Sequence, residues 1–213
     1  PEGSYAAVSC AEAGGILHFN CSGNHLDFEA GQRLVEIVLA SEHLETVILG
    51  GRYAKAISGA KWGAFIGHGA VVPVKALKRN LAEVESLDFS KNPLHVGGGY
   101  VLCCLLGANK SCRSLNLANC HIGQNAAAVL ARALKINRSI TTLNLSNNDL
   151  KSGFVEIAAH ALTTNTITDL DISNNDIEAK GAALLAHVLA CDTTLTKVRR
   201  RRRQQRRRRQ QRR

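Results

Sequence analysis

A nine-residue pattern that returns at a nearly constant interval constrains this 213-residue chain more than any other feature. Four segments share the frame L-x-L-x-x-N/C-x-L, in which Phe or Ile can replace Leu: SLDFSKNPL (86–94), SLNLANCHI (114–122), TLNLSNNDL (142–150) and DLDISNNDI (169–177). The frame also fits residues 16–26, fits residues 44–54 loosely, and begins again at Leu195. Its N/C position recurs at 24, 52, 92, 120, 148 and 175, so every step is 27 or 28 residues except one of 40. Such a period is typical of stacked repeat units.

Each unit predicts one strand followed by one helix. Alternation of L-x-L puts apolar side chains on one face of a short strand, near residues 19–21, 47–49, 87–89, 115–117, 143–145 and 170–172. The Asn that follows can satisfy backbone groups where the chain bends away, and Cys120 makes a weaker version of that contact. In the helical half we expect a buried apolar column at Val38, Leu106, Leu134, Leu162 and Leu189. Each helix is expected to end near Asn109, Asn137, Asn165 and Asp192.

Over about residues 16–198, this frame resembles the leucine-rich repeats of the ribonuclease-inhibitor type. The resemblance implies an α/β solenoid, a right-handed βα superhelix with a parallel sheet on the concave face and helices on the convex face. About six units would bury their apolar faces only against their neighbours. Residues 1–15 are then an N-terminal capping segment, and residues 199–213 a separate basic tail. Because the chain starts with Pro1 and contains no Met, we expect a processed form or a fragment.

The long step indicates an insertion of twelve residues near 53–70, within the glycine-rich stretch GGRYAKAISGAKWGAFIGHG (50–69). Lys61 is followed by Trp62 rather than by Ser or Thr, which argues against a phosphate-binding P-loop. Insertions in repeat proteins often carry binding sites, so Trp62 and Phe65 are candidate partner-binding residues. The alternative is a loop that folds back over its own core.

The concave face is expected to present the polar residues that alternate with the buried Leu positions. They are small, with a carboxylate in two units and no basic cluster, which favours a protein partner over a phosphate backbone. Asp88, Asn116, Asn144 and Asp171 are the candidate partner-binding residues on this face, flanked by Ser90, Ser146 and Ser173.

Residues that could act as nucleophiles have structural explanations in this frame. Cys120 precedes His121, but it occupies the position that Asn fills in other units. Cys103 and Cys104 are neighbours in a predicted helix, where successive side chains point about 100° apart. We therefore predict no catalytic residue, no small-molecule substrate and no enzymatic activity.

No metal site or other cofactor is predicted either. His160 and His187 fall in one outward column on successive helices, which pack about 8–10 Å apart and so suit metal coordination poorly. The seven cysteines include no CxxC pair, and an odd number favours free thiols in a reducing, intracellular compartment. Cytoplasm and an organelle matrix such as that of the mitochondrion remain open. Apolar runs are too short to cross a membrane.

The C-terminal segment RRRRRQQRRRRQQRR (199–213) dominates the charge of the chain. The chain has 27 Lys and Arg against 17 Asp and Glu; without the eleven arginines of this segment the count is 16 against 17. A guanidinium pairs with phosphate or carboxylate, and no aromatic residue is present to stack on bases, so we predict sequence-independent RNA binding. An acidic protein, such as a cytoskeletal polymer, is the alternative ligand, and an unselected low-complexity extension is another. The candidate RNA-binding residues are Arg199, Arg200, Arg201, Arg202, Arg203, Arg206, Arg207, Arg208, Arg209, Arg212 and Arg213.

Together these patterns predict a non-enzymatic protein-interaction scaffold, a subunit of a large ribonucleoprotein assembly such as a ribosome. The alternatives are a free-standing repeat adaptor for acidic or cytoskeletal proteins, and a regulator of a small GTPase. The third rests only on similarity of the repeat type to the Ran GTPase-activating protein, because no constellation of residues supports that activity here.

Overall fold

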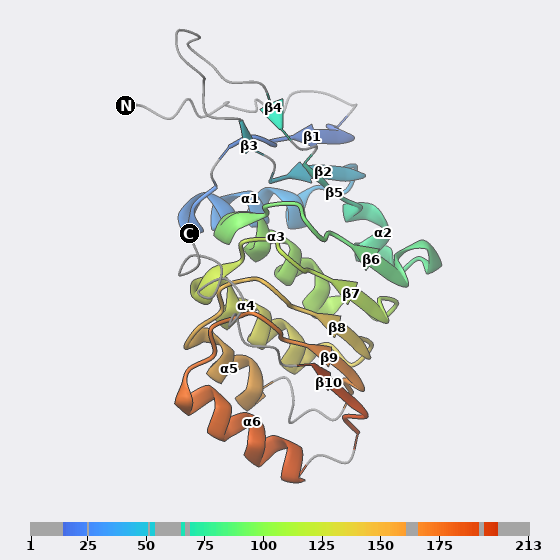
Figure 1. The fold of residues 1–213 in the computed structure, drawn as a ribbon. Coiled ribbons are helices and arrows are strands. Elements are labelled where there is room, and N and C mark those ends of the chain that lie inside the picture. The colour runs from blue at the N-terminus through green and yellow to red at the C-terminus, as the bar shows by residue number, and fades with distance from the viewer. Residues whose placement is uncertain are drawn as a thin grey trace, which may run out of the picture.

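Strands stack along one side of the molecule and helices along the other (Figure 1). The structure, a computed structural model, describes residues 15–24, 26–50, 52–53, 65–66, 69–160, 166–191 and 194–199. The elements in order are β1 (His18–Asn20), α1 (Phe28–Ala40), β2 (Thr46–Leu49), β3 (Arg52–Tyr53), β4 (Phe65–Ile66), β5 (Ala70–Val72), α2 (Val74–Arg79), the 3-10 helix η1 (Ala82–Val84), β6 (Ser86–Asp88), α3 (His95–Ala108), β7 (Ser114–Asn116), α4 (Gly123–Ile136), β8 (Thr142–Asn144), α5 (Gly153–His160), β9 (Asp169–Asp171), α6 (Ala179–Cys191) and β10 (Lys197–Arg199).

Five strands form a parallel sheet in the order β10-β9-β8-β7-β6. Leu87, Leu115, Leu143 and Leu170 lie in register across it, which confirms the predicted repeat and the parallel order. The strands begin one residue earlier than predicted, because the residue before the first Leu already pairs. The last residue predicted for each strand still bonds to the next unit, as Leu117 N does to Asn144 O at 2.8 Å. The continuation of the repeat at Leu195 becomes β10.

The apolar column of the helices is confirmed where the structure describes it, except at its end. Val38, Leu106 and Leu134 are almost fully buried. Leu189 is 43% exposed, however, and Val188 is buried in its place. α6 is the last helix of the described residues and packs on α5, so no following helix covers Leu189. Leu162 lies outside the described residues.

The second unit departs from the others. β5 pairs antiparallel with β2, so β1-β2-β5 forms a separate three-stranded sheet, and β3 and β4 form an antiparallel pair. The expected parallel sheet is therefore interrupted at the predicted insertion. Phe65 belongs to β4, whereas Trp62 lies outside the described residues.

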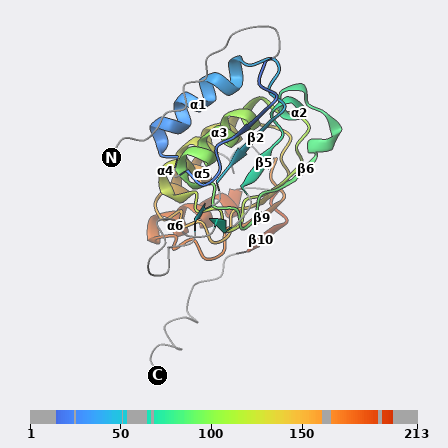
Figure 2. The same cartoon turned by 90° about the horizontal axis from the view of Figure 1, so that it is seen from above.

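The helix of this unit, α2, has only six residues, and α1 therefore packs directly against α3 (Figures 1 and 2). Two glycines permit this approach. A Cβ on Gly31 would lie 2.7 Å from the Gly97 Cα, and one on Gly97 would lie 2.4 Å from the Asp27 carbonyl oxygen. The backbone N of Gly97 donates to Leu26 O at 3.0 Å, which joins the first unit to the third.

Although short, α2 contacts the C-terminal end of α1. Lys78 Nζ donates to Leu39 O in the last turn of α1 at 2.9 Å and to the O of the C-cap Ser41 at 2.7 Å. A cation is favourable there because the carbonyl end of a helix carries partial negative charge.

Candidate functional site

A buried ladder of side chains fixes the bend after each strand. Asn148 Nδ2 donates to Leu117 O of the preceding unit at 2.6 Å and to Leu145 O at 3.0 Å, while Asn148 Oδ1 accepts from Cys120 N at 2.9 Å. Asn175 repeats the pattern, donating to Leu145 O at 2.7 Å and accepting from Asn148 N at 2.8 Å. The predicted role of the frame asparagine is confirmed, and the amide also bridges neighbouring units.

Cys120 occupies the same position of the repeat frame, but its side chain makes fewer hydrogen bonds than the asparagine. Its Sγ donates to Phe89 O at 3.1 Å, the carbonyl equivalent to Leu117 O. Sulfur is a weak acceptor, and the N–H of Asn92 also bonds to Phe89 O at 3.2 Å. Burial raises the pKa of the Cys120 thiol to about 12, so the thiol is neutral at physiological pH. The structure therefore places Cys120 at the buried frame position that Asn fills in other units, as predicted.

A second buried ladder lies at the ends of the helices. Asn109 Nδ2 donates to Leu77 O at 2.9 Å, and Asn137 Nδ2 donates to Leu106 O at 2.7 Å and to Asn109 O at 2.8 Å. The helix ends predicted at Asn109 and Asn137 are confirmed. The bridging between units was not predicted, although the 28-residue spacing of these asparagines could have indicated it.

The concave sheet face presents two columns of polar side chains. The first contains Asp88, Asn116, Asn144, Asp171 and Arg199, and the second contains Ser86, Ser114, Thr142, Asp169 and Lys197, each in register across the five strands. The four predicted partner-binding residues of this face therefore form one continuous row.

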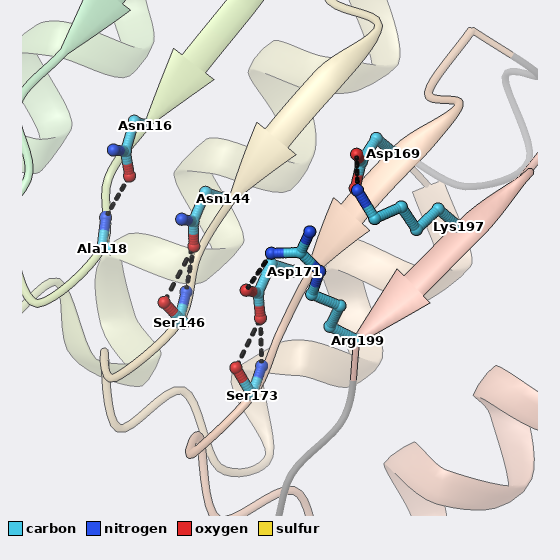
Figure 3. A network of polar contacts seen from close by, with 9 residues as sticks. All are labelled: Asn116, Ala118, Asn144, Ser146, Asp169, Asp171, Ser173, Lys197 and Arg199. Carbon is cyan, nitrogen blue, oxygen red and sulfur yellow. Dashed lines mark hydrogen bonds and ion pairs between the residues drawn. The ribbon is translucent and has the colours of Figure 1, made fainter.

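Each member of the predicted row is oriented by its own turn, and Figure 3 shows this for Asn116, Asn144 and Asp171. Asn116 Oδ1 accepts from Ala118 N, Asn144 Oδ1 from Ser146 N and Oγ, and Asp171 Oδ1 from Ser173 N and Oγ. Asp88 Oδ1 likewise accepts from Ser90 N at 2.8 Å. Burial opposes ionisation of Asp88, but hydrogen bonds from Ser90 and Asn116 outweigh it and hold the pKa of the carboxyl below its usual value. These bonds fix the side chains in place on the rigid sheet.

Cations of the last strand cover the carboxylates at one end of this face (Figure 3). Lys197 Nζ lies 3.0 Å from Asp169 Oδ2, and Arg199 Nη1 lies 3.9 Å from Asp171 Oδ2. Arg199 is therefore part of β10 and of the concave face, so the boundary between repeats and tail falls after residue 199 rather than before it. Asp171 faces this cation rather than open solvent. The other ten tail arginines lie outside the described residues.

Other chemistry-bearing residues do not assemble into a site. Among the residues that the structure describes, no three His, Cys, Asp or Glu side chains could hold a metal ion together. Cys21, Cys103, Cys104, Cys112 and Cys120 are free thiols. Burial raises the pKa of Cys103 as well, and His187 is exposed, whereas the side chain of His160 is outside the description. No helix within the described ranges is both long and apolar enough to span a bilayer.

The fold and its two ladders define a solenoid of strand–helix units whose exposed polar face is built on a parallel sheet. The family model described as "Leucine Rich repeat" matches residues 137–152 and 164–186. These two segments lie in regular units of the solenoid, whose strand–helix architecture is that of a leucine-rich repeat fold. Such domains generally bind other proteins, and no catalytic family is indicated.

A solved structure titled Leiomodin-1 Actin-Binding Site 2 has a similar fold, with a TM-score of 0.52 and 24% sequence identity. The match covers 60% of this chain and 76% of the other. No curated protein sequence matches this chain.

Proposed function

We propose that the concave face binds a protein and that residues 200–213 bind RNA, which makes the chain a non-enzymatic subunit of a ribonucleoprotein assembly. The carrying observation is the separation of charge. Residues 200–213 hold ten of the 27 basic residues and no acidic ones, so residues 1–199 have 17 basic and 17 acidic residues. A part of the chain with no net charge, joined to a strongly cationic segment, suits two different ligands.

The chemistry of the concave face supports a protein ligand there. Amide and hydroxyl groups of Asn116, Asn144, Ser114 and Thr142 occupy its centre, and the cations of β10 are already within 4 Å of carboxylates. Phosphate binding depends mainly on cations, which this centre lacks among the described side chains. Amides can both donate to and accept from a peptide backbone or polar side chains.

Further parts of the proposal follow from the same features. The 27- to 28-residue units, each with a helix, support the ribonuclease-inhibitor type of repeat. The free thiols favour a reducing compartment, either cytoplasm or an organelle matrix. Residues 1–15 are proposed as an N-terminal cap and the 53–70 insertion, with Trp62 and Phe65, as a further protein contact.

The RNA proposal is tested by salt dependence. Affinity of the full chain for a fluorescent 30-nucleotide polyuridylate is measured between 50 and 200 mM salt, beside a variant with all ten arginines of residues 200–213 changed to Gln. If half of these arginines contact phosphates, log Kd should change with log salt with a slope of about 3.5, at about 0.7 per phosphate. The Gln variant should lose most of this dependence, and an all-Lys variant should keep much of it. Equal binding by the Gln variant would remove the tail from the proposal.

The protein-binding proposal is tested by site-specific photo-crosslinking in cells. A photoreactive residue at Thr142 lies on the concave sheet, and the same residue at Lys180 lies exposed on α6 as the matched control. Crosslinks to one defined protein from position 142 alone support the concave site. Identical products from both positions would contradict it.

A cytoskeletal partner is the second candidate, because the same arginines can pair with acidic filaments. The leiomodin structure is named for an actin-binding site, so filamentous actin is the first filament to test. Co-sedimentation of the full chain but not the Gln variant, combined with no RNA binding, would favour this candidate. A role as a small-GTPase regulator would require stimulated GTP hydrolysis, which no group of described residues favours.

A further inference from the structure

Four exposed cations lie on the edge of the solenoid where helices lead into strands. Arg79 ends α2, Lys110 and Arg113 lie between α3 and β7, and Arg138 lies between α4 and β8. We call these four residues the cationic edge. They are outside the concave face and the tail, and the sequence pattern gave them no role.

The loops that carry the cationic edge touch one another. The backbone N of Lys110 donates to Asn80 Oδ1 at 2.5 Å, so the first loop contacts the second. Arg113 Nη1 donates to Ser139 O at 3.4 Å, and Asn137 Nδ2 donates to Asn109 O at 2.8 Å, so the second contacts the third. The cations therefore stand side by side on three consecutive turns, and the Arg113 guanidinium reaches the residue next to Arg138.

Ordinary structural roles account for only part of this row. The helix dipole favours Arg79, which lies in the last turn of α2, but its effect falls off within that turn. Lys110 and Arg113 follow the C-cap Asn109, and Arg138 follows the C-cap Asn137, so they lie beyond the helices. In the described part of the chain, five side-chain ion pairs have N–O distances below 4.0 Å, and none of them includes Arg79, Lys110 or Arg113.

Three carboxylates lie near the row without reversing its sign. Glu83 and Glu85 precede β6, and Glu85 O accepts from Arg113 N at 2.8 Å, so Glu85 lies at the border of the cationic edge. The pKa of Glu45 is lowered mainly by Lys75, which lies 2.7 Å away, and to a smaller extent by Arg79. With Lys75 included, five cations against three anions leave a local excess of positive charge, although residues 1–199 are neutral as a whole. Like charges held close together are relieved by a bound anion.

We propose that the cationic edge is a second contact for the phosphates of single-stranded RNA, in addition to the tail. This inference rests on the proposed function and names a surface of the folded domain for it. Arginine can bind a phosphate through two parallel N–H groups, and lysine binds it as a point charge. The edge carries no aromatic residue, so binding is independent of base sequence.

The test uses the full-length chain with the ten arginines of residues 200–213 changed to Gln, so that the edge is measured without the tail. Its affinity for polyuridylate is compared with that of a variant that adds Arg79→Gln, Lys110→Gln and Arg113→Gln. A matched control adds Arg33→Gln, Arg132→Gln and Lys180→Gln, which remove the same charge from exposed helical positions. Thermal unfolding of each variant checks that it is folded, and Arg113→Lys alone, which keeps the charge, should bind like its parent.

We expect the tail-neutral chain to bind with a slope of log Kd against log salt of about 3, from four cations at about 0.7 each. The edge variant should lower this slope to about 0.7, the share of Arg138, and weaken binding about tenfold or more at low salt, while the control changes neither. No binding by the tail-neutral chain, or an equal loss in the control, overturns the cationic edge and leaves the proposed tail function standing. If the tail-neutral chain binds as tightly as the unmodified chain, the proposed RNA-binding role of the tail is wrong. The edge variant then tests the role of the cationic edge by itself. If polyglutamate competes for the cationic edge as well as RNA does, the ligand is an acidic protein and the proposal of RNA binding at the edge is wrong.

Discussion

The second and fourth repeat units pack against their neighbours in different ways. The fourth, β7 with α4, has a full helix and contacts its neighbours through the two asparagine ladders. The second has an antiparallel strand, an added pair of short strands and a helix of six residues, and the first and third units meet across it at Gly31 and Gly97. Packing between the regular units therefore depends on hydrogen bonds of the asparagine side chains, whereas packing across the irregular unit depends on two glycines that lack a side chain.

The largest expected effect is on the regular units. Asn148→Ala should lower the free energy of unfolding by about 3 kcal/mol, because buried groups such as Cys120 N and Leu117 O lose their partner. Urea unfolding followed by circular dichroism measures this loss. The matched control is Asn147→Gly, at an exposed neighbour with φ of 59°, which should cost only a few tenths of a kcal/mol.

Asn147→Ala would be a poorer control than Asn147→Gly, since alanine in the left-handed region costs about 1 kcal/mol. Equal losses in Asn148→Ala and Asn147→Gly would mean that the ladder does not carry the stability of the regular units.

The second effect concerns the irregular unit. Gly97→Ala should cost about 2 kcal/mol, because its Cβ would meet the Asp27 carbonyl oxygen and force α1 away from α3. Gly99→Ala in the same helix meets Ala126 Cβ at an ordinary 3.5 Å and should be neutral or stabilising, since alanine is the better helix former. Denaturant midpoints of the two variants give the comparison. A harmless Gly97→Ala would contradict close packing of the first and third units.

The third effect sharpens the difference between Asn and Cys in the ladder. The pKa of Cys120 is raised from 9.0 to about 12 in the folded chain, so its contribution to stability is complete below about pH 9 and is lost as pH rises toward 12. Between pH 9 and 10 the free energy of unfolding should fall by about 1 kcal/mol more in the unsubstituted protein than in Cys120→Asn, because the asparagine at position 120 does not titrate. Stability measured at both pH values tests this, and parallel losses in the two proteins would show that the thiol does not titrate as described.

The smallest effect is at the last strand. Arg199→Ala should lower stability by less than about 0.5 kcal/mol, because the guanidinium is more than half exposed and 3.9 Å from Asp171. Lys197→Ala, with a 3.0 Å pair to Asp169, serves as the comparison and should cost slightly more. Thermal melts at low and high salt measure both. A loss of several kcal/mol would indicate that β10 closes the core rather than covering carboxylates.

The sequence by itself determined the solenoid, its parallel order and the place of the bends. The reason is physical: each Leu and Asn acts within its own unit or on the next, so a local pattern repeated at 28 residues carries the information. The polar row from Asp88 to Asp171 could be predicted for the same reason, because side chains alternate along a strand.

Only the tertiary structure decided how the repeat is broken and how loop side chains turn. It placed α1 on α3 across the shortened second unit, and it set Lys110 beside Asn80 and Arg113 beside Ser139 in the loops between neighbouring units. No periodic signal marks these contacts, since they depend on how an irregular segment shortens a helix and on how each loop is oriented. The pairing of Arg199 with Asp171 follows the 28-residue period, but it could be recognised only once β10 was seen to continue the sheet.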